Sequence, residues 1–155
     1  MKNFAAKTLF VLFAIVSVFT ATTPVQAGNG GYTKAEVDRI INRVETRSDI
    51  FVKSFDRALD HSRLNGSNRE DYLNKRAKDL EKALDELRRE FDRRDLWIEN
   101  KDEVRRCLNI ATDINVAMKN RKFGFGVESN WAALRVELNA LATAYGLPKV
   151  GSAAY

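Results

Sequence analysis

Reactive side chains are scarce in this sequence, which contains one cysteine, Cys107, and one histidine, His61. A nucleophilic site needs a base beside the nucleophile, and these two residues are the only Cys–His pair that the chain offers. They fall on different predicted helices, without a recognisable sequence context. A c-type haem would need two cysteines followed by a histidine, whereas Cys107 is followed by Leu108 and Asn109. The sequence therefore predicts a protein that is not an enzyme and carries no cofactor.

Asp56, Asp60 and His61 could in principle hold one metal ion. Asp56 and Asp60 are four residues apart and share a face of a predicted helix, but His61 is turned by about 100° from Asp60. A di-iron bundle uses a Glu-x-x-His motif on each of two helices, and the residue three before His61 is Ala58. We therefore expect no metal site here.

The favoured interpretation of Cys107 is a small buried hydrophobe beside Leu108 on a helical pattern. The alternative is an intermolecular disulfide or a redox site. Because one cysteine cannot form an internal disulfide, stability must come from packing.

One segment, residues 120–126, is a candidate binding site. It combines two aromatic residues, two glycines and a basic lead-in within an otherwise regular pattern, and aromatic side chains in loops are often binding contacts. In an extended segment Phe123 and Phe125 would point to the same side. Arg121 and Lys122 would add attraction for an acidic surface. The alternative is that both rings plug the open end of a helix bundle.

The elements that must position these residues are amphipathic helices, of which residues 67–95 are the clearest. Nine basic and nine acidic side chains fill most of this stretch, and they predict a solvated face rather than a charged recognition surface. The apolar residues recur at alternating steps of four and three, which places them on one stripe of a helix. They are Leu73, Ala77, Leu80, Leu84, Leu87 and Phe91.

Similar stripes predict an all-α antiparallel four-helix bundle built on a long helical hairpin, with helices over about 34–63, 68–95, 101–119 and 129–145. Capping boxes at Thr33 and Ser67 mark the first two starts, and Asn100 gives a weaker third signal. Since the last two helices are shorter, we expect one end of the hairpin to protrude, or the first helix to bend near Ser48. The tail, residues 149–155, is expected to be loose.

The start of the chain has the pattern of a Sec-type signal peptide, with Lys2 and Lys7 before an apolar run and small residues at Val25 and Ala27. Cleavage after Ala27 would leave one domain, residues 28–155, outside the cytoplasm. Without the signal peptide the formal net charge falls from +5 to +3 because two lysines are lost. The remaining basic residues are interleaved with acidic ones, so we expect no nucleic-acid partner, and no later stretch is apolar enough to cross a membrane.

These features favour a secreted or periplasmic protein that works by binding another macromolecule, as an interaction, adaptor or chaperone-like module. The partner would be another envelope or secreted protein, and the oligomeric state stays open. Small periplasmic helical chaperones share these general features, but their recurring Leu-Thr-x-x-Gln signature is absent here. The alternative is a carrier of an apolar small molecule or lipid, in a cavity lined by the rings of Phe51, Phe55, Trp131 and Tyr145.

Overall fold

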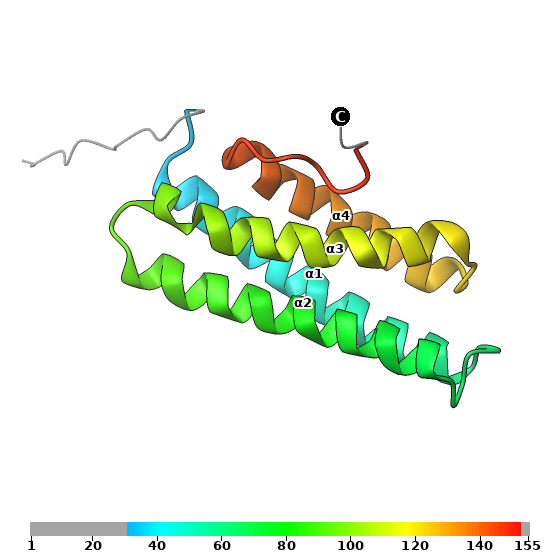
Figure 1. Ribbon diagram of the computed structural model, residues 1–155. Coiled ribbons are helices and arrows are strands. Elements are labelled where there is room, and N and C mark those ends of the chain that lie inside the picture. Colours follow the sequence, from blue (N-terminus) through cyan, green and yellow to red (C-terminus); the bar gives the residue numbers. More distant parts are fainter. Residues whose placement is uncertain (1–30, 153–155) are drawn as a thin grey trace, which may run out of the picture.

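The computed structural model describes residues 31–152, which form an antiparallel four-helix bundle (Figure 1). The fold class predicted from the sequence is confirmed, whereas the predicted signal peptide lies outside the described residues. No helix within residues 31–152 is both long enough and apolar enough to cross a membrane. The elements are α1 (Lys34–Asp60), α2 (Asn68–Arg93), the short 3-10 helix η1 (Trp97–Asn100), α3 (Lys101–Asn120) and α4 (Phe125–Ala144).

Each helix turns an apolar stripe toward one common core. The α2 stripe predicted from the sequence is buried at all six positions. The helix α1 packs mainly against α4 and α2, and α3 packs more extensively on α2 than on α4. The four helices therefore form a ring in chain order.

Polar side chains cap the starts of α1 and α2, the two helices of the long hairpin. The Thr33 side chain accepts a hydrogen bond from the Glu36 amide at 3.1 Å, and the Glu36 carboxylate accepts one from the Thr33 amide at 2.8 Å, which completes the predicted capping box. The second box forms only in part. Ser67 accepts from the Glu70 amide at 3.3 Å, but the Glu70 carboxylate accepts from the amide of Gly66 at 2.5 Å. Gly66 has a φ of +75° and ends the turn.

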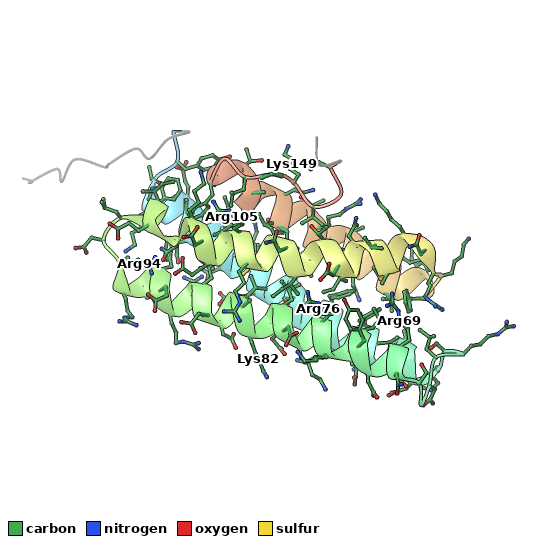
Figure 2. The ribbon with its side chains drawn as sticks, viewed as in Figure 1. Arg69, Arg76, Lys82, Arg94, Arg105 and Lys149 are labelled. Atoms are coloured by element: carbon green, nitrogen blue, oxygen red, sulfur yellow. The ribbon has the colours of Figure 1, made fainter. Side chains whose placement is uncertain are left out.

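The charged residues of α2 serve two purposes. Lys82 points away from the bundle into solvent (Figure 2). Arg88 instead turns toward α1, where it donates hydrogen bonds to Asp38 at 2.6 Å and Glu45 at 3.1 Å. Part of the face predicted to be solvated therefore joins neighbouring helices. Two further ion pairs join α2 to α3 and α1 to α4, namely Arg76–Asp113 and Arg43–Glu137.

Two predicted helix ends are corrected by local hydrogen bonds and turns. The helix α1 ends at Asp60 rather than near 63, because Ser62 and Asn65 bond the last carbonyls through their side chains, at 2.8 and 2.5 Å. The chain leaves α2 two residues early and enters η1, which the sequence did not indicate. Asn100 makes no side-chain cap; its amide group donates to the Trp97 carbonyl at 3.3 Å.

The helix α4 begins at Phe125, four residues before the predicted start, with Gly124 at the N-cap. The expectation of a loose tail is wrong for residues 149–152. Val150 is buried, and its amide donates to the Asn139 side chain at 2.8 Å. These contacts hold the segment after α4 against that helix. Residues 153–155 lie outside the described residues.

Ser48 is a buried polar residue of the first helix. It is 1% exposed in the middle of α1, and its hydroxyl has no hydrogen-bond partner among the described residues. The helix runs through this position from Lys34 to Asp60 as one element.

Candidate functional site at the turn end

Two connections meet at one end of the bundle. Because successive helices are antiparallel, the α1–α2 turn, residues 61–67, and the α3–α4 connection, residues 121–124, lie at the same end (Figure 1). We call this region the turn end. It contains all of the candidate binding residues predicted from the sequence, Arg121, Lys122, Phe123 and Phe125.

The two phenylalanine rings of this region have different environments. Phe123 is partly buried, and its ring meets that of Phe55 edge-on at a centroid distance of 5.0 Å. Phe125 is 87% exposed. The segment is not extended through both residues, because Gly124 has a φ of +96° and Phe125 already belongs to α4. The prediction that both rings point to the same side is therefore wrong: Phe123 plugs the bundle and Phe125 faces solvent.

A cluster of buried aromatic rings lies beneath the Phe123 ring. Phe51 stacks on Phe55 at 5.0 Å and contacts Trp131 at 5.1 Å. The indole N–H of Trp131 donates to the Asn115 side chain at 3.2 Å, which joins α4 to α3. Because aromatic pairs of this geometry add to the stability gained by burial, Phe123 anchors the α3–α4 connection directly on the core.

The rings considered for a carrier site fall into two groups. Phe51, Phe55 and Trp131 pack on one another, whereas Tyr145 packs edge-on against Trp97 at 5.0 Å. The Tyr145 hydroxyl donates to the Trp97 carbonyl at 2.9 Å, and burial raises the pKa of Tyr145 well above its ordinary value. Since the rings of each group fill the space beside one another, they act as core residues of the bundle.

A groove of about 410 Å³ lies between the two connections of the turn end. One wall is made by residues 61–64 and the other by residues 121–123. Only the second wall was predicted from the sequence. The first was predictable too, because the hairpin turn of an antiparallel bundle must lie at the end where α3 passes into α4.

The groove is lined by basic and neutral side chains. Arg63, Arg121 and Lys122 make no ion pair with any side chain in residues 31–152. The nearby carboxylate of Glu70 is buried and bonded to Gly66. The cations that line the groove are therefore not held in ion pairs by the described part of the chain.

The two reactive residues of the sequence are separated by the fold. His61 lies at the turn end, where its Nδ1 is 2.7 Å from the Arg57 carbonyl. Cys107 is fully buried near the opposite end of α3. Burial raises the pKa of the Cys107 thiol to about 12, so the thiolate, which is the nucleophilic form, is disfavoured. Within residues 31–152 no three metal-ligating side chains gather at one place.

We expect Cys107 to resist alkylation in the native protein and to react rapidly after unfolding. Burial raises the pKa of the Cys107 thiol and also keeps the reagent away from it, and both effects slow alkylation. Mass spectrometry after maleimide treatment, with and without denaturant, measures this difference. Complete labelling of the folded protein within minutes would contradict the buried placement and reopen the disulfide interpretation.

Comparison of the chain with protein families, curated proteins and solved structures found no match in any of the three.

Proposed function

We propose that this is a secreted or periplasmic helical bundle that binds another envelope or secreted protein through its turn end, as an interaction, adaptor or chaperone-like module. The observation that carries the proposal is Phe125, a large ring that is 87% exposed at the first residue of α4. Burying such a side chain against a partner is worth roughly 1.5–3 kcal/mol. Phe125 is therefore the expected apolar anchor of the contact.

The surroundings of Phe125 support a binding role. The helix that carries it packs extensively against α1, and the connection before it is fixed by Phe123. A ring presented from a rigid element loses little conformational freedom on binding. Arg121 and Lys122, a few residues before the ring, add long-range attraction for an acidic surface. The signal-peptide pattern of residues 1–27 supports the proposed location.

Phe125→Ser is expected to abolish capture of the partner while leaving the thermal midpoint nearly unchanged, because the ring contributes little to the core. The measurement is affinity capture from extracts of the host, with the captured proteins identified by mass spectrometry. Val136→Ser is the matched control, since Val136 is 65% exposed and lies on the same helix. A specific partner should be retained by the native chain and by the control and lost with Phe125→Ser.

Phe123→Ser separates the structural role from the binding role. This change should lower the thermal midpoint by several degrees, because it removes a partly buried ring from the plug. Capture that survives Phe125→Ser would reject Phe125 as the anchor of the contact.

A further inference from the structure

The groove of the turn end is built from two segments that are far apart in the sequence. Residues 61–64 follow α1, and residues 121–123 follow α3. Its volume, about 410 Å³, falls within the size range of pockets that hold small ligands or a few side chains. The groove can therefore take part of a partner's chain but not a folded domain.

The walls of the groove are held by hydrogen bonds within the fold. The Ser62 amide donates to the Leu59 carbonyl at 3.0 Å, and the Leu64 amide donates to the Ser62 hydroxyl at 3.0 Å. Arg63 stands between these two bonded residues. On the opposite wall, Phe123 is fixed against Phe55. Because these hydrogen bonds and the ring contact hold both walls, binding would require little rearrangement of the backbone.

The charge of the groove indicates the chemistry of its ligand. Arg76 and Arg88 each meet a carboxylate of a neighbouring helix, whereas Arg63, Arg121 and Lys122 have none within residues 31–152. An arginine guanidinium matches a carboxylate with two parallel hydrogen bonds, and a lysine ammonium acts as a point charge. Two guanidinium groups and one ammonium on facing walls favour a ligand with several negative charges.

We propose that this groove binds an acidic segment of the partner protein, whose Asp or Glu carboxylates pair with Arg63, Arg121 and Lys122. The inference rests on the proposed function of the turn end and adds the α1–α2 turn as a second half of the site. The apolar side chains of Leu64 and Phe123 lie in the same groove and would contact the methylene groups of bound glutamates. Three cations are few for a nucleic acid, which often engages about 6–10 phosphate contacts.

The experiment measures binding of synthetic peptides to residues 28–155 by NMR, following the backbone amides of the two walls. The first probe is an eight-residue peptide of six glutamates and two leucines, blocked at both ends. The second replaces every glutamate by glutamine, and the third probe is inorganic phosphate. We expect the acidic peptide to shift the amides of residues 61–64 and 121–123 together, and its affinity to fall as salt is raised. The glutamine peptide and phosphate should bind at least tenfold more weakly.

Charge-removing variants then test the individual contacts. Arg63→Gln and Arg121→Gln should each lower the affinity for the acidic peptide by about three- to fivefold. This loss is the upper part of the range for exposed ion pairs. Arg63→Lys should lose less affinity than Arg63→Gln, because it keeps the charge but not the paired hydrogen bonds of the guanidinium. Lys82→Gln is the matched control, since it removes the same charge from the outer face of α2 (Figure 2). All variants should keep the native thermal midpoint.

Several outcomes would overturn the inference. They are equal binding of the acidic and glutamine peptides, tighter binding of phosphate than of the acidic peptide, or equal losses for Arg63→Gln and Lys82→Gln. The partner capture assay keeps this result separate from the proposed function. Capture that is lost with Phe125→Ser but not reduced at all by Arg63→Gln rejects the groove and retains the turn end as a binding site. Capture that is reduced by Arg63→Gln but unchanged by Phe125→Ser rejects Phe125 as the anchor and retains the groove.

Discussion

Replacing Leu84 by alanine is expected to lower the free energy of unfolding by about 2–5 kcal/mol. Leu84 is 1% exposed in the middle of α2, on the stripe that faces the common core. Truncating the side chain leaves a cavity, and the surrounding helices can close it only in part. Chemical denaturation measures the effect: the midpoint should fall, while the slope of the free energy of unfolding against denaturant concentration stays unchanged.

Lys82→Ala is the control for this prediction because it removes a long side chain from the exposed face of the same helix. Its effect should stay within about 0.5 kcal/mol. Equal losses for the two variants would mean that the buried face of α2 is assigned incorrectly.

Phe55→Ala is expected to destabilise the protein by about 3–5 kcal/mol and also to loosen the turn end. The Phe55 ring is fully buried and contacts both Phe51 and Phe123 at 5.0 Å. It therefore joins the centre of the core to the connection that carries the candidate site. Denaturation gives the loss of stability, and hydrogen exchange of residues 121–124 reports the loosening.

A double-mutant cycle with Phe123→Ala tests the contact itself. The two changes should be less than additive by about 0.5–1.5 kcal/mol, since each removes the same aromatic pair. Strict additivity would show that Phe123 is not anchored on Phe55. The rigid support invoked for Phe125 would then be absent.

Local signals in the sequence predicted most of the fold. The period of Leu73, Leu80, Leu84 and Leu87 identified the buried side of α2, because helix geometry alone places residues three and four apart on one face. The Thr33 capping box marked the start of α1 for a similar reason, since its hydrogen bonds join residues three apart. Such interactions join residues a few positions apart within one helix, so their spacing can be read from the sequence.

Two features of the chain explain why the predicted start of α4 and the predicted loose tail were wrong. The two glycines near Phe125 suggested a continuous loop, but one of them, Gly124, takes up the positive φ that allows α4 to begin at once. The tail has no periodic pattern, yet Val150 is buried and hydrogen-bonded to Asn139. One apolar side chain that packs against a helix produces no repeating apolar pattern, so its burial cannot be predicted from spacing.

By itself, the sequence determined that the chain forms four amphipathic helices, which residues face their core, and that residues 120–126 interrupt the regular pattern. Only the tertiary structure decided which of two neighbouring rings, Phe123 or Phe125, is buried, because that depends on whether Phe55 of a distant helix is within reach. It also brought residues 61–64 beside residues 121–123 to form one groove. Such a groove depends on the relative placement of helix ends, and packing of the whole core sets that placement.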